Sequence, residues 1–274
     1  MDEAKQEILI KNNIMVKAKY NLNTVENKVF QLILFNLQKQ NKDTMLAEIP
    51  KRDFQSILNK DVYKTTKGIS NILVKLRKAD IWFIKNNKWG NYGFINGFSY
   101  DEDTQEFTIK ADAEIYKMLF DYLKGYTPVN LAIFFGFKSY YTQRFYELLR
   151  LWSNAKTKIN YTVDELRDLL MLNEKLKAYS DFKKRIITPA VKELNEKSLM
   201  KIDIKEHKMG RKVISIDFMV TDNDKRKYFE DLDNKNDKKE VEYNPAKKLK
   251  FKNFDEREYD YNELERKLLG WECD

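Results

Sequence analysis

The sequence predicts an α+β protein in which one supersecondary unit occurs twice. Three observations support this fold class. Each half opens with a long amphipathic helix, at 23–40 and 139–155. Each half continues with a short extended piece and two further helices, and each ends in alternating apolar and polar residues typical of a hairpin. With 274 residues and 42% apolar side chains, the chain is large enough for two cores.

The long helices are identified by a cap and by their apolar spacing. Asn23 and Glu26 form a capping box at the start of the first helix. Apolar residues then follow a helical period in both helices. They are Val29, Phe30, Ile33, Leu34 and Leu37 in the first, and Tyr141, Phe145, Leu148, Leu149 and Trp152 in the second.

The second and third helices also recur. The second helices lie in 47–58 and 159–170, and the third helices lie in 63–80 and 179–198. Pro50 marks the start of one second helix, and Thr162 and Glu165 form a capping box at the start of the other. The apolar positions of the third helices align, with Ile69, Ile72, Leu73 and Leu76 matching Ile187, Ala190, Val191 and Leu194.

Each unit ends in a predicted hairpin. The first, 81–110, is long and aromatic and includes Gly90, Gly93 and Gly97, whereas the second, 199–220, turns at 207–211. Helix, strand, helix, helix and hairpin is the order of a winged helix, whose third helix enters the DNA major groove. We therefore predict tandem winged-helix domains of common ancestry at 1–128 and 129–222, followed by a charged tail at 223–274. Two unrelated α+β domains with a chance repeat are the alternative.

The overall charge favours an anionic partner. Lysine and arginine total 51 against 43 acids, which gives a net charge of +8 and a pI near 9.1. Nucleic acid is the first candidate partner, a membrane surface is a weaker one, and plain solubility is the alternative. The single cysteine, Cys273, allows no disulfide within the chain, which fits a reducing cytoplasm. There is no secretory signal and no apolar run long enough to cross a membrane.

Several catalytic classes are excluded by composition. His207 is the only histidine, so hydrolase triads and zinc sites lack their residues. The phosphate-binding pattern GxxxxGK[ST] is absent. We therefore expect no enzymatic activity, no cofactor and no metal, although a carboxylate-only, magnesium-dependent nuclease stays open.

The segment 179–198 carries the strongest binding signal. Its core face consists of Phe182, Ile186, Ile187, Ala190 and Leu194, and cations and hydroxyls occupy the opposite face near its start. Cations at a helix N-terminus oppose the helix dipole, so an anion there would stabilise them. Pro189 should bend the helix.

These considerations give a set of candidate DNA contacts. In the second unit they are Ser180, Lys183, Lys184, Arg185 and Thr188 on the third helix and Lys208, Arg211 and Lys212 on the wing. In the first unit, where the signal is weaker, they are Lys64, Thr65, Thr66 and Lys67 at the third helix and Lys88 in the hairpin. A solvated lysine face is the alternative for both sets.

Five segments resemble the iteron-binding plasmid replication initiators, the Rep proteins of theta-replicating plasmids. They are "LNTVENKVFQLIL", "RFYELLRLW", "YTVDELRDLL", "YSDFKKRIITPAVKELN" and "GRKVISIDF", and the resemblance spans about residues 10–222. It implies that the C-terminal winged helix reads repeated double-stranded origin sequences, with Lys183, Lys184 and Arg185 as readers. It also implies that the N-terminal one adds DNA contacts and dimerises, in exchange with the monomer.

The same resemblance implies a cytoplasmic bacterial protein that opens an AT-rich origin segment, recruits host helicase or initiator proteins and represses its own gene as a dimer. A partner protein would then hydrolyse the ATP that replication requires. The sequence favours a flexible linker at 223–250 and leaves two roles open for 251–274, a docking peptide for a host protein or a tail packed on its own body. A winged-helix transcriptional repressor without a replication role is the alternative function, and a protein-binding scaffold is another.

Overall fold

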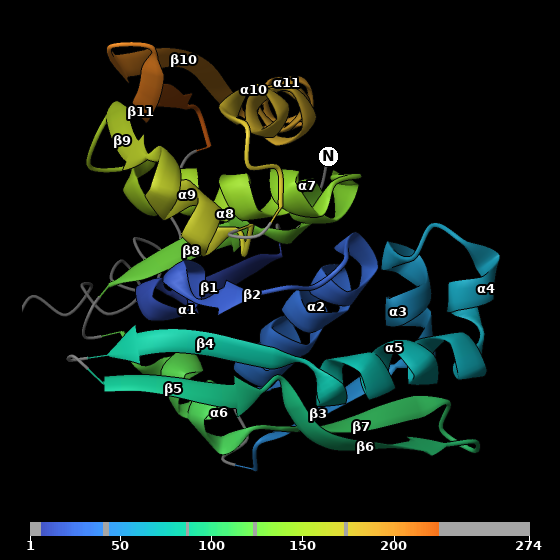
Figure 1. The fold of residues 1–274 in the computed structure, drawn as a ribbon. Coiled ribbons are helices and arrows are strands. Elements are labelled where there is room, and N and C mark those ends of the chain that lie inside the picture. The colour runs from blue at the N-terminus through green and yellow to red at the C-terminus, as the bar shows by residue number, and fades with distance from the viewer. Residues whose placement is uncertain (1–6, 41–43, 86–87, 123–124, 173–174, 225–274) are drawn as a thin grey trace, which may run out of the picture. The chain divides into compact units, whose positions relative to one another are not determined.

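The computed structural model describes residues 7–40, 44–85, 88–122, 125–172 and 175–224, and Figure 1 shows their arrangement. The predicted roles of the tail beyond residue 224, namely the linker and the 251–274 segment, fall outside the described residues. Within the described ranges the chain forms two units of matching topology, preceded by a short N-terminal lead.

The N-terminal lead packs against both units. It consists of β1 (Ile8–Asn12), α1 (Asn13–Lys17) and β2 (Lys19–Tyr20). Strand β2 pairs with β4 (Asp80–Lys85) of the first unit, and α1 contacts α8 (Tyr140–Ser153) of the second. Strand β1 pairs antiparallel with β8 (Tyr126–Asn130), which lies between the two units in the sequence. The sequence patterns did not predict this lead, because its strands are too short to show a clear alternation.

The first unit follows the predicted order as far as its third helix. Its elements are α2 (Thr24–Gln40), β3 (Leu46–Pro50), α3 (Lys51–Ile57), α4 (Asp61–Lys64) and α5 (Thr66–Lys78). The predicted capping box is present, since Asn23 Oδ1 accepts the Glu26 N–H at 2.9 Å and Glu26 Oε2 accepts the Asn23 N–H at 2.9 Å.

The prediction of a single hairpin over 81–110 is wrong. The segment forms two hairpins, β4 (Asp80–Lys85) with β5 (Lys88–Gly93) and β6 (Ile95–Asp101) with β7 (Glu106–Ala111). The hairpins belong to different sheets, with strand orders β2-β4-β5 and β3-β7-β6. Phe94, which links the two hairpins, and Ile95, which begins β6, are almost fully buried. The chain therefore enters the core at this point and does not continue as a single hairpin. Helix α6 (Ala113–Phe120) then closes the unit.

The second unit has the predicted winged-helix order without such an insertion. After α7 (Leu131–Gly136) come α8 (Tyr140–Ser153), β9 (Lys158–Thr162) and α9 (Val163–Leu169), then a third helix over 179–197. The hairpin β10 (Met200–Met209) and β11 (Lys212–Asp222) completes it. At the start of α9, Thr162 Oγ1 accepts the Glu165 N–H at 3.0 Å, as the capping box predicts.

Sheet topology confirms the repeat. The strand orders β10-β11-β9 and β3-β7-β6 place the strand before the second helix against the last strand of the hairpin in both units. Hairpin β6–β7 is therefore the wing of the first unit, and β4–β5 is an insertion that the second unit lacks. The predicted tandem winged-helix fold is confirmed.

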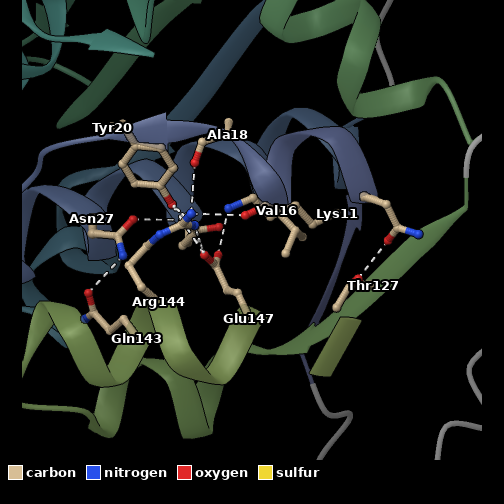
Figure 2. A network of polar contacts seen from close by, with 11 residues as sticks. Lys11, Val16, Ala18, Tyr20, Asn27, Thr127, Gln143, Arg144 and Glu147 are labelled. Carbon is tan, nitrogen blue, oxygen red and sulfur yellow. Dashed lines mark hydrogen bonds and ion pairs between the residues drawn. The ribbon is translucent and has the colours of Figure 1, made fainter. Parts of the chain in front are cut away.

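A buried polar network joins the lead to α8 (Figure 2). Glu147 accepts a hydrogen bond from Lys11 at 2.7 Å and one from Arg144 at 2.7 Å, and all three side chains are fully buried. Arg144 also donates to the carbonyl oxygens of Val16 at 3.0 Å and Ala18 at 2.9 Å. These bonds between α8 and the lead tie the lead to the second unit.

Candidate nucleic-acid interface

The third helix of the second unit is continuous but irregular. It begins as α10 (Tyr179–Phe182), passes through a π-helical turn at Lys183–Ile187 and ends as α11 (Thr188–Lys197). In the π turn the Thr188 N–H bonds to the carbonyl of Lys183, five residues back. Pro189 has no N–H to continue the α-helical ladder, which accounts for an irregularity at this point, although we predicted a simple bend.

The two faces of this helix are those that the sequence predicts. Phe182, Ile186, Ile187, Ala190 and Leu194 are buried. Ser180, Lys184, Arg185 and Thr188 are exposed, so the predicted contacts share one outward face. Among the described residues, neither Lys184 nor Arg185 has a hydrogen-bonding or ion-pair partner. Two uncompensated cations near a helix start provide a site that suits phosphate oxygens or guanine edges.

Lys183 differs from its two neighbours because it already has a protein partner. Its Nζ lies 2.7 Å from Oε1 of Glu206 on β10, and the same oxygen accepts the Tyr179 hydroxyl at 2.7 Å. The hydrogen bond from Lys183 is the main cause that holds the pKa of Glu206 below its usual range, against a smaller effect of burial. The Lys183 side chain is 41% exposed. The structure therefore brings Lys183 close to the site but directs its charge toward the wing.

The wing of the second unit ends in a basic turn. Lys208, Met209, Gly210, Arg211 and Lys212 are all exposed. The turn is shorter than the predicted 207–211, because His207 still pairs with Ser215 and Lys208 with Val213 across a β-bulge. Gly210 has φ +60, a conformation that glycine adopts without strain. In Figure 1 this hairpin lies beside α10 and α11, so helix and wing can face one ligand.

A carboxylate on β11 stabilises the base of the wing. Asp217 Oδ2 lies 2.5 Å from His207 Nε2 and 2.9 Å from Lys158 Nζ, while its Oδ1 accepts Asn160 at 2.7 Å. The hydrogen bond from His207 is the foremost cause that holds the pKa of Asp217 well below its usual range. The only histidine of the chain thus has a structural contact within the wing, where it joins β10 to β11.

The far end of the third helix is also fixed. Glu193 accepts the Lys138 N–H at 2.7 Å and pairs with Lys197 at 2.7 Å, and Lys197 donates to the Gly136 carbonyl at 2.9 Å. These bonds join α11 to the segment between α7 and α8. The helix is therefore held at its start by the wing and at its end by the core, which gives its exposed face a defined direction.

The first unit presents its predicted contacts less openly. Thr65 caps α5, where its Oγ1 accepts the Gly68 N–H at 2.9 Å, and Lys64 pairs with Asp61 at 3.4 Å. Thr66 is half-buried and Lys67 is exposed. Lys88 lies on β5, and its side chain is outside the described part of the structure. These residues surround the start of α5, and Lys67 is the exposed cation among those described, since Lys64 is half-buried.

The wing of the first unit has the opposite charge to that of the second. Its tip holds Asp101, Glu102 and Asp103, all exposed, and the Asp101 carboxylate accepts the Asp103 N–H at 2.8 Å and closes the turn. On the inserted hairpin, Trp82 and Trp89 stack with ring centroids 5.7 Å apart, and Trp89 is 73% exposed. The wing tip is thus basic in the second unit and acidic in the first.

Two features are absent from the described residues. None of their His, Cys, Asp and Glu side chains gather in a group of three or more that could hold a metal ion. Within the same ranges, no helix combines the length and the apolar character needed to span a bilayer.

Two winged helices in tandem, one with cations on its third helix and at its wing tip, define a DNA-binding protein of the helix-turn-helix class. The chain belongs to the family of initiator replication proteins. The family model described as "Initiator Replication protein, WH1" matches residues 8–150, and the one described as "Initiator Rep protein, WH2" matches residues 162–220. The resemblance to plasmid replication initiators stated from the sequence is confirmed.

One solved structure supports this fold. The crystal structure of Pi initiator protein in complex with iteron DNA matches with a TM-score of 0.60 at 17% identity, over 80% of this chain and 99% of that chain. A structure of domains 2 and 3 of RctB matches with a TM-score of 0.41 at 13% identity, over 72% of this chain and 81% of that one. No curated protein matches the chain in sequence.

Proposed function

We propose that this chain initiates plasmid replication by binding repeated double-stranded sequences at an origin. The observation that carries this proposal is the outward face of the third helix in the second unit, where Lys184 and Arg185 have no partner among the described residues. They would bond to base edges in the major groove. The Pi initiator was crystallised with iteron DNA, and the shared fold supports the same ligand class here.

The wing supplies the positioning contacts. Lys208, Arg211 and Lys212 are exposed cations beside the helix and would bind phosphates of the flanking backbone. Ser180 and Thr188 would add hydroxyl contacts from the helix. Specific recognition would therefore belong to the second unit, assigned here to 129–222.

The first unit, assigned to 1–128, would have a supporting role. It would dimerise in exchange with the monomer and add DNA contacts at the start of α5, through Lys67 above all. As a monomer the protein would promote opening of an AT-rich segment and recruit host replication proteins in the bacterial cytoplasm, and as a dimer it would repress its own gene. The absence of a phosphate-binding loop in the sequence means that a partner would hydrolyse ATP.

Footprinting on the DNA that flanks the gene of this protein, at two salt concentrations, tests the proposal. Evenly spaced protected direct repeats next to an AT-rich tract are the expected result. A single protected inverted repeat at a promoter, without direct repeats, would instead assign the protein to the transcriptional repressors. A complete lack of protection at low salt would refute DNA recognition by this surface.

A further inference from the structure

Glu206 occupies an unusual position in the wing. It follows Ile202 and Ile204 on the inward face of β10, where strand alternation calls for another apolar residue. Its side chain is only 19% exposed, and it reaches the start of the third helix instead of solvent. A carboxylate in the middle of a basic interface opposes the binding of phosphates, so its presence there needs a reason.

The contacts of Glu206 suggest that reason. One oxygen, Oε1, receives both the Lys183 ammonium and the Tyr179 hydroxyl, each at 2.7 Å. Tyr179 is the first residue of the helix, and Lys183 is the first residue of the π turn. The carboxylate therefore joins the wing to the helix at the point where the backbone leaves α-helical geometry.

This arrangement separates three adjacent cations into two groups. Lys184 and Arg185 point outward without a partner in the described chain, whereas Lys183 is neutralised by a carboxylate within hydrogen-bonding distance. A lysine released at this position would be a flexible point charge and would accept any phosphate, independent of sequence.

We propose that Glu206 is a specificity-determining positioning residue, which withholds Lys183 from the DNA backbone and fixes the wing relative to the reading helix. This inference rests on the proposed function, because it assumes that the helix reads DNA. Glu206 acts through Lys183 and Tyr179 and need not touch the DNA itself. Its effect is to lower binding to unrelated sequences more than binding to the origin repeats.

The test is Glu206→Gln in the full chain, with affinity measured on origin repeats and on a random duplex between 50 and 200 mM salt. The amide keeps the shape and still accepts the Tyr179 hydroxyl, but it carries no negative charge to neutralise the lysine. One additional phosphate contact steepens the salt dependence by about 0.9, so affinity for random DNA should fall about 3.5-fold more over this range. The ratio of specific to nonspecific affinity at low salt should fall as well.

Two further variants make the result interpretable. Glu114→Gln removes an acid that holds Lys117 at 2.6 Å on α6 of the first unit, so it makes the same change in net charge away from the reading helix. It should leave the salt dependence unchanged. Lys183→Ala combined with Glu206→Gln should return the salt dependence to the wild-type value, an outcome that loss of structure would not produce.

The possible failures are distinguishable. If wild-type protein shows no preference for any repeat, the proposed function itself fails. If the wild type is specific but Glu206→Gln leaves both the salt dependence and the specificity ratio unchanged, only the role of Glu206 is refuted. An equal change in Glu114→Gln would also refute it, because net charge would then account for the effect.

Discussion

The buried cluster around Glu147 allows a quantitative prediction that distinguishes its members. Glu147 is the single anion between two fully buried cations, Lys11 and Arg144, at 2.7 Å from each. Substitution with glutamine keeps the size of the side chain but removes the negative charge. Lys11 and Arg144 would then repel each other without compensation in a region that excludes water.

The magnitude follows from the cost of leaving buried charges unpaired. Removing one partner of a buried ion pair destabilises a protein by about 3–5 kcal/mol. Against a total stability of about 5–15 kcal/mol, Glu147→Gln should remove a large fraction. Lys11→Met should cost less than about 2 kcal/mol, because the remaining Arg144–Glu147 pair is neutral and Arg144 keeps its bonds to two backbone carbonyls.

Urea unfolding of the full chain at pH 7, followed by circular dichroism, measures both differences. Glu114→Gln, which breaks an exposed pair, is the control and should leave the free energy of unfolding nearly unchanged. Burial is the main cause that lowers the pKa of Lys11 from 10.5 in the folded state. Wild type should therefore gain stability relative to Lys11→Met as the pH rises toward 10.5. A cost for Lys11→Met equal to that of Glu147→Gln would refute this account of the cluster.

Three more predictions concern the interface. Lys184→Ala and Arg185→Ala should each weaken specific binding by about 1–3 kcal/mol in a titration of origin DNA, and unchanged affinity in both would refute the reading-helix assignment. Lys212→Ala should weaken binding to all sequences equally and flatten the salt dependence by about 0.9, which the same titration at several salt concentrations measures. Because the pKa of Asp217 is depressed when folded, its contribution to stability is present above its ordinary pKa of 3.8 and is lost as the pH falls further. Asp217→Asn should therefore lower the melting temperature at pH 7, and the difference from wild type should shrink in strong acid.

Local rules predicted the helices of both units and the faces that they bury. The capping boxes at Asn23 and Thr162 form as expected, because such caps depend on residues three positions apart. The buried positions of the third helix were also predicted correctly, despite the π turn. One extra residue in a helical turn rotates the following side chains by a smaller angle than the apolar face covers. The apolar pattern therefore still predicted which residues are buried.

Long-range contacts between charged residues were not predictable in this way. Arg144, Glu147 and Arg150 follow one another at three-residue spacing on α8, a pattern usually read as a solvent-exposed stripe. The structure buries all three. Their partners lie in the N-terminal lead and at the end of β11, more than 70 residues away for Arg150 and Asp222.

The charges of the two wings indicate how the duplicated units divide their work. Phosphate contacts need cations at the wing tip, and the second unit has Lys208, Arg211 and Lys212 there, whereas the first has exposed acids at 101–103. Like charges within about 8 Å are only partly screened at physiological salt, so the first wing would repel a DNA backbone that approached it. We therefore expect any DNA contact of the first unit to avoid the wing tip, and the start of α5, with Lys67 exposed, is the predicted alternative. The two units thus share a topology but present wing tips of opposite charge, and a few residues at the turns account for this difference in charge.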